Sequence, residues 1–375
     1  MRKIYQLLCL LFMAFAVKAQ PPVKTVTIMG HVTGDNKGYD KIYYYTNAAQ
    51  FDSVSIKDHA FKITLPFKST YNQILFTDYE RKVTGRNRLF PLLIRRPGVL
   101  QLEMDIDSGL YAATITGNKS TELFNEFNHR EEKIGKDVLS QIHQIHSAHT
   151  EWKLSKLQYK ALWDSLATGP TGKVVSDIIS AHPDDFASVF ILQMSKSILP
   201  LSVIRTCLEK LSPNLRQTHG AKAMRLYLNA RGKVKTGDKA PAFELADLHQ
   251  HFFDFNKQKG KYVLLDFWVS WYEPCKTAFP FLQKLYAQYK EQNFEIVDIS
   301  MDSKTAWKNR EKVMHNPWPQ LWDNKLVATR YAVTSPSTFI LIDPNGKILL
   351  KETTLEKNGA IDRKLAGFFK NNKIN

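Results

Sequence analysis

The stretch Leu264–Cys275, which reads LLDFWVSWYEPC, decides the fold of the C-terminal third of this chain. Its first half is an apolar strand run that ends at Trp268 and contains one acid, Asp266. Its second half leads through a second tryptophan and two spacer residues to Pro274 and Cys275. Glu273 lies at the expected start of a helix, where a carboxylate interacts favourably with the helix dipole.

The residues around this stretch alternate between strand and helix patterns. A strand–helix–strand unit followed by a hairpin and a last helix indicates an α/β domain over residues 232–375. The expected elements are strands Tyr262–Phe267 and Phe294–Ile299, helix Phe279–Lys290, a hairpin of Phe339–Ile342 with Lys347–Leu350, and helix Ile361–Phe369.

Several segments of this domain resemble the TlpA/ResA-like branch of the thioredoxin superfamily, whose domain is of the redoxin, or AhpC/TSA, type. The matching segments are Gly237–Phe243, Gly260–Trp268, Ile299–Asp302, Tyr331–Val333 and Ile342–Ile348. The resemblance implies a thioredoxin fold and thiol–disulfide oxidoreductase ancestry, and we expect no cofactor.

The active-site motif departs from that family at its first cysteine. In working members a C-x-x-C pair attacks a disulfide through the first thiolate, and the second cysteine resolves the mixed disulfide. Here Tyr272 occupies the first position, and a phenol with a pKa near ~10 cannot attack as a thiolate does. Cys275, the buried acid Asp266, Trp271 and Pro274 keep their family positions.

Two further positions differ from the family pattern. Ala278 stands where many members carry an acid. In the loop that faces the active site, counting back from Asp343 puts Ser337 at the position of the family's cis-proline, with Pro336 one place early. An alignment shift of one residue would return Pro336 to that role, so both assignments stay open.

These departures lead to competing hypotheses about function. The first is a redox-inactive binding or scaffold module that holds an envelope protein or peptide in the former substrate groove, around Trp271, Tyr272, Glu273, Pro274, Pro336 and Ser337. The alternative is a residual monothiol oxidoreductase that acts through Cys275, with Asp266 as proton acceptor. A third hypothesis assigns the function to the N-terminal region. Enzymatic activity therefore stays an open question.

The front of the chain reads differently. Residues 23–118 alternate apolar and polar residues, which predicts an all-β, sandwich-like domain with turns at Gly30, Gly34–Asn36 and Asp58–His59. This region resembles the small all-β domain of unknown function that often precedes a redoxin domain in envelope proteins. Residues 120–231 follow a helical pattern, and we expect Pro170, Pro183, Pro200 and Pro213 to separate its helices.

The first residues predict an export signal. Arg2 and Lys3 precede the apolar run Ile4–Val17, and Val17–Ala19 resembles a cleavage site, so residues 1–19 are read as a signal peptide rather than a membrane span. We therefore expect a protein of the periplasm or cell envelope. The oligomeric state does not follow from the sequence.

Composition argues against two other classes of function. The formal net charge is +16, yet the basic residues are scattered among acids, which favours a solvated surface over nucleic-acid binding. His143, His146 and His149 recur every third residue and fan across a helix, so we expect no metal site there. Cys207 fits an apolar helix face and is expected to be inert.

Overall fold

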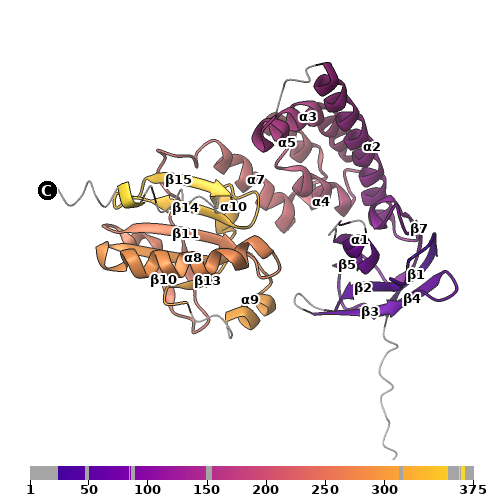
Figure 1. Cartoon of the computed structure of the whole chain (residues 1–375), viewed down its shortest axis with the longest axis horizontal. Helices are drawn as coiled ribbons and strands as arrows, with labels where there is room; N and C mark the ends of the chain where they lie inside the picture. The colour runs from indigo at the N-terminus through magenta and orange to yellow at the C-terminus, as the bar shows by residue number, and fades with distance from the viewer. Residues whose placement is uncertain are drawn as a thin grey trace, which may run out of the picture.

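A computed structural model describes residues 24–46, 50–83, 85, 89–148, 154–311, 316–353, 363 and 365–367. Along the chain, two sheets are followed by a group of helices and then by an α/β domain, as the sequence predicts (Figure 1). The predicted signal peptide at residues 1–19 lies outside the described residues. Among the described residues, no helix has the length and apolar character needed to cross a bilayer.

The N-terminal part, called the β domain here, consists of two four-stranded sheets with strand orders β4-β1-β7-β8 and β3-β2-β5-β6. Strand β1 pairs antiparallel with β4 and parallel with β7. Its elements are β1 Thr25–Thr33, β2 Lys41–Tyr45, β3 Phe51–Ser55, β4 Ala60–Pro66, β5 Tyr71–Thr77, α1 Asp78–Lys82, β6 Phe90–Ile94, β7 Gly98–Asp105, the 3-10 turn η1 Leu110–Ala112 and β8 Thr114–Thr116.

Gly30 is not a turn residue, contrary to the sequence-based expectation. It lies within β1, directly opposite Phe61 of β4. A Cβ atom at Gly30 would stand 1.9 Å from Cε1 of the Phe61 ring. The strand therefore continues through this glycine because the absent side chain makes room for the aromatic ring.

The middle of the chain is helical and runs from the β domain to the C-terminal domain (Figure 1). Its helices are α2 Lys119–Ala148, α3 Lys156–Ala181, α4 Phe186–Ser195, α5 Leu201–Lys210, α6 Pro213–Arg216 and α7 His219–Arg231. Pro183, Pro200 and Pro213 lie at helix boundaries as predicted, but Pro170 lies inside α3.

The helix tolerates Pro170 because other interactions stabilise it. Ser155 and Gln158 form a capping box at the start of α3, and the Thr168 hydroxyl donates to the Asp164 carbonyl oxygen at 2.5 Å. Helix α3 also packs against α2, α4 and α5. Burial of its apolar side chains outweighs the ~3 kcal/mol that an interior proline costs.

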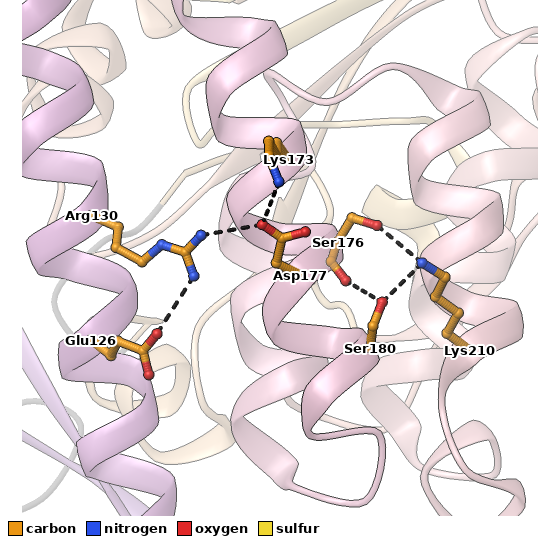
Figure 2. Close-up of polar contacts among 7 residues, drawn as sticks. All are labelled: Glu126, Arg130, Lys173, Ser176, Asp177, Ser180 and Lys210. Carbon is orange, nitrogen blue, oxygen red and sulfur yellow. Dashed lines mark hydrogen bonds and ion pairs between the residues drawn. The ribbon is translucent and has the colours of Figure 1, made fainter.

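Polar contacts link α3 to α2 and to α5 (Figure 2). Arg130 of α2 reaches Asp177 at 3.3 Å, and Lys210 of α5 donates to the hydroxyls of Ser176 and Ser180 at 3.2 and 2.9 Å. Exposed pairs of this kind contribute about 0–1 kcal/mol each, so they orient the helices more than they stabilise them.

The C-terminal domain is built on a five-stranded sheet of order β13-β12-β11-β14-β15. The central strand β11 is parallel to β12 and antiparallel to β14, which forms a hairpin with β15. The elements are β9 Glu244–Ala246, β10 Phe252–Asp254, η2 Phe255–Gln258, β11 Tyr262–Trp268, α8 Glu273–Tyr289, η3 Lys290–Gln292, β12 Phe294–Ser300, α9 Lys304–Glu311, β13 Gln320–Trp322, α10 Val327–Arg330, β14 Thr338–Ile342 and β15 Ile348–Thr353.

These elements confirm the predicted α/β arrangement. Every residue of β11 is buried, which agrees with the apolar run in its sequence. The predicted last helix, Ile361–Phe369, lies mostly outside the described residues, of which Arg363 and Leu365–Gly367 are helical. The predicted domain boundaries at 23–118, 120–231 and 232–375 stay predictions, because one buried apolar core extends from Val26 through Ile178 to Val263.

Candidate functional site

The candidate site is formed where β11 ends and α8 begins. Tyr272 is the N-cap of α8, with φ −92° and ψ 115°, and its side chain makes no capping hydrogen bond. Glu273 and Pro274 occupy the first two helical positions. The Cys275 N–H donates to the Tyr272 carbonyl oxygen at 3.1 Å, which places Cys275 in the first turn. The structure thus puts the phenol at the helix tip and the single thiol inside the helix.

Cys275 is enclosed, with 1% of its surface exposed. Burial raises the pKa of its thiol to about 11, and the negative charge of Asp266 acts in the same direction. The polar groups of the Val269 backbone and of Ser337 lower the pKa but do not cancel this rise. Almost no thiolate is therefore present at neutral pH, and a thiol in this state is a poor nucleophile.

The facing loop brings Ser337 to the thiol. Ser337 is buried, its hydroxyl oxygen has no hydrogen-bond partner among the described residues, and its proximity lowers the pKa of the Cys275 thiol slightly against the effect of burial. Its φ of 60° lies in the left-handed region, and the described residues contain no cis peptide bond, so Pro336 follows a trans bond. The Thr338 hydroxyl donates to the Ser335 carbonyl oxygen at 2.8 Å and closes the loop. Ser337 is thus a residue of this loop that acts on the cysteine, and the assignment of Pro336 or Ser337 to the family's proline position stays a prediction.

Asp266 lies below the cysteine and is buried beside a second acid. Asp266 of β11 and Asp298 of β12 are register partners, and both side chains are shut off from solvent. Neither Asp266 oxygen has a hydrogen-bond partner among the described residues. Burial, followed by the charge of Asp298, raises the Asp266 pKa well above its ordinary value. Both effects favour the protonated form of the Asp266 carboxyl.

Asp298 was missed by the sequence-based reasoning. Its carboxylate oxygen Oδ2 accepts from Gln320 Nε2 at 2.8 Å and from Asn316 Nδ2 at 3.2 Å. Burial raises its pKa to about 7, although these hydrogen bonds act in the opposite direction. An acid inside the apolar run Phe294–Ser300 was the available signal, but only the strand register places it beside Asp266.

The rim of the site consists of side chains that face solvent. Trp271 is 54% exposed, and its ring meets the half-buried Tyr272 ring edge-on at a centroid distance of 6.0 Å. Glu273 pairs with Lys276 at 3.0 Å on the outer face of α8. The Ser270 N–H donates to Asp302 Oδ2 at 2.7 Å, which ties the loop before α8 to the loop after β12.

A cleft of about 910 Å³ opens beside Trp271. One wall is formed by the C-terminal domain, through the loops that follow β11 and β12, and the other by the β domain. The sequence could not reveal the second wall, because its residues lie roughly 200 positions from Trp271 and meet it only in the fold. Residues of the β domain and of the C-terminal domain thus line one cleft together.

The remaining candidates lie elsewhere. Cys207 is buried in α5, where burial raises its pKa. His143 and His146 are exposed on α2, and His149 lies outside the described residues. No group of three or more potential ligands able to hold a metal ion occurs among the residues that the structure describes.

Comparisons with known proteins agree with the geometry of the C-terminal domain. The family model for the AhpC/TSA family matches residues 236–351. The chain is 35% identical over 122 residues to a thiol-disulfide oxidoreductase ResA of Bacillus cereus, covering 32% of this chain and 70% of that protein. It is 36% identical over 118 residues to ResA of Bacillus subtilis, covering 31% of this chain and 66% of that protein.

Among solved structures, the thioredoxin domain of a thiol-disulfide oxidoreductase from Bacteroides vulgatus is 33% identical, with a TM-score of 0.33, and covers 36% of this chain and 99% of that one. The ResA matches and the family model both fall on the part of the chain that carries the five-stranded sheet and the Tyr272–Cys275 turn. On this evidence from sequence and fold, the chain belongs to the TlpA/ResA-like proteins of the thioredoxin superfamily, with a redoxin domain of the AhpC/TSA type.

Proposed function

We propose that this chain is an exported protein of the cell envelope whose C-terminal domain binds a protein or peptide segment and no longer runs a dithiol cycle. The predicted signal peptide at residues 1–19 and the kinship with ResA support export. The ancestral chemistry is thiol–disulfide exchange, which needs an accessible thiolate at the helix tip. Tyr272 holds that position in this chain.

The proposal rests mainly on the burial of Cys275 and the raised pKa of its thiol. The thiol is enclosed behind Tyr272, and its pKa is raised to about 11 by burial. Attack on a disulfide requires both access and ionisation. A protein whose only cysteine at the site lacks both has little capacity to act as a reductase.

The surface of the former substrate groove is nevertheless retained. Trp271 is half exposed at its rim, beside Tyr272. The loop that contains Pro336 also carries Ser337, which acts on the Cys275 thiol. The proposal places the bound segment along this rim.

A monothiol enzyme acting through Cys275 is the rival reading. In its favour, the Asp266 carboxyl near the thiol has no hydrogen-bond partner among the described residues and could receive a proton. Against it, the Cys275 thiol is enclosed and its pKa is raised to about 11, so it offers little thiolate for attack on a disulfide.

The test is a disulfide-reduction assay with insulin as substrate and dithiothreitol as reductant. We expect the parent protein and the Cys275→Ser variant to give the same rate as the protein-free background. A Tyr272→Cys variant serves as the matched positive control, because it restores the missing thiol at the helix tip. If the parent protein reduces insulin faster than Cys275→Ser, the monothiol enzyme is correct and the binding proposal is wrong.

A further inference from the structure

The cleft between the two domains has the properties of a binding site. Its volume of about 910 Å³ lies within the range of ligand pockets, and such pockets occur preferentially at domain interfaces. Trp271 and Met301 line one side, and Tyr45, Tyr71 and Ile74 line the other. The walls are thus mainly apolar and aromatic, and two parts of the chain form them jointly.

An aromatic strip on the outer face of the β domain leads away from this cleft. The Tyr43 ring stacks on Phe76 at 5.0 Å, and the Tyr45 ring lies 5.9 Å from Phe76. Phe51 on the edge strand β3 meets Phe76 edge-on at 5.5 Å and is 53% exposed. Phe76 itself is buried, but the Tyr45 ring also meets Phe51 at 6.2 Å and lines the cleft, so a path of aromatic side chains leads from Phe51 to the cleft beside Trp271.

The length of that surface favours an extended chain over a compact small molecule. Successive side chains of an extended peptide advance by ~3.3 Å per residue, so a short segment can place several apolar groups along the strip and into the cleft. Exposed apolar surface of this kind, rich in Tyr, Phe and Trp, is typical of protein interaction sites.

The charged residues that line the cleft indicate which polar group a ligand should carry. Lys68 lines the cleft, is exposed, and makes no ion pair with any residue that the structure describes. The one acid in the lining, Asp302, is only 8% exposed, and its carboxylate accepts from the Ser270 N–H. The free charge in the cleft is therefore positive and complements an acidic group.

We infer that the cleft binds an extended peptide segment that carries aromatic or large aliphatic side chains and an acidic group. The apolar side chains lie between Trp271 and the aromatic face of the β domain, and the acidic group pairs with Lys68. This inference rests on the proposed binding function and adds to it the chemistry of the partner. It also gives the β domain a role, as the second wall of the site.

The experiment is a selection of displayed random 12-residue peptides on the folded protein, followed by fluorescence-polarisation titration of the enriched peptides. Two variants probe the cleft, Trp271→Ala and Lys68→Glu. Two matched controls change the same kinds of exposed residue outside it: Phe252→Ala, at a ring that is 68% exposed on β10, and Lys62→Glu on β4.

We expect enriched peptides to combine aromatic or aliphatic residues with Asp or Glu. Trp271→Ala and Lys68→Glu should each weaken their binding at least tenfold, and the two controls should change it less than twofold. Selection on Lys68→Glu should favour Lys or Arg in place of the acid. This reversal would identify Lys68 as the charge partner, since general instability cannot produce it.

Three results would overturn the inference. The first is enrichment of basic peptides on the parent protein, and the second is equal loss of binding in the controls and the cleft variants. The third is binding of 8-anilinonaphthalene-1-sulfonate that depends on Trp271 and Lys68 without any peptide enrichment, which would make the cleft a small-molecule site. Insulin reduction by the parent protein, in contrast, would refute the proposed function while leaving the peptide result to stand on its own.

Discussion

Asp266 and Asp298 stand side by side on parallel strands, with both carboxyls shut off from solvent. Gln320 and Asn316 donate to Asp298, whereas Asp266 has no partner among the described residues. Two like charges on paired, buried residues are unfavourable, so burial and then the charge of Asp298 raise the pKa of Asp266.

This pair predicts that stability falls as the pH rises. Both carboxyls have raised pKa values in the fold, and that of Asp298 is raised to about 7. The folded chain therefore binds more protons than the unfolded chain above pH ~4, and this stabilising contribution is lost as the pH rises through about 7. Each unit of pKa difference corresponds to about 1.4 kcal/mol.

Urea denaturation at half-unit steps from pH 4.5 to 8 measures this effect. We expect Asp298→Asn to flatten the dependence of the unfolding free energy on pH. The control Glu291→Gln, at a side chain that is 87% exposed, should keep the parent slope. A parent protein whose stability does not decline between pH 5 and 7 would contradict the raised pKa values.

The left-handed backbone at Ser337 predicts that two substitutions there change the stability of the protein by different amounts. Proline fixes φ near −65° and cannot adopt the φ of 60° found there, so Ser337→Pro should destabilise the protein by more than about 1 kcal/mol. Glycine accepts this conformation freely, so Ser337→Gly should stay within about 1 kcal/mol of the parent. Thermal and urea unfolding compare the two variants, and a fully stable Ser337→Pro would show that the loop accepts a different backbone.

The close approach of Phe61 to Gly30 predicts that alanine destabilises the protein at Gly30 but not at Gly135. Gly30→Ala would place a methyl group 1.9 Å from the Phe61 ring, so we expect a loss of about 1–3 kcal/mol from overpacking. Gly135→Ala in α2 meets nothing closer than 3.9 Å and should stabilise by up to about 1 kcal/mol. Equal effects of the two substitutions on the unfolding free energy would argue against the pairing of β1 with β4.

The sequence predicted those parts of the structure that local patterns control. The apolar run before Trp268 predicted β11, and the turn at Asp343–Gly346 predicted the hairpin of β14 and β15. Alternating apolar residues predicted the N-terminal sheets. In each case the signal and the structure that it specifies lie within about ten residues of one another.

Predictions failed or were absent where distant contacts decide the structure. Gly30 was read as a turn because the strand that supplies Phe61 is not visible in the local pattern. Pro170 was read as a helix break, although packing against α2, α4 and α5 keeps α3 continuous. The pairing of Asp266 with Asp298 and the second wall of the cleft depend on tertiary contacts in the same way.

The central claim, that Cys275 is an enclosed and un-ionised thiol, is tested most directly by its rate of alkylation against pH. The protein carries Cys9→Ser and Cys207→Ser, so that Cys275 is the one thiol left. We predict that iodoacetamide and N-ethylmaleimide modify it no faster than the protein unfolds, because burial and a thiol pKa raised to about 11 leave almost no reactive thiolate in the folded protein. Rapid modification of the folded protein with an apparent pKa below ~8.5 would contradict the account and establish a live thiolate.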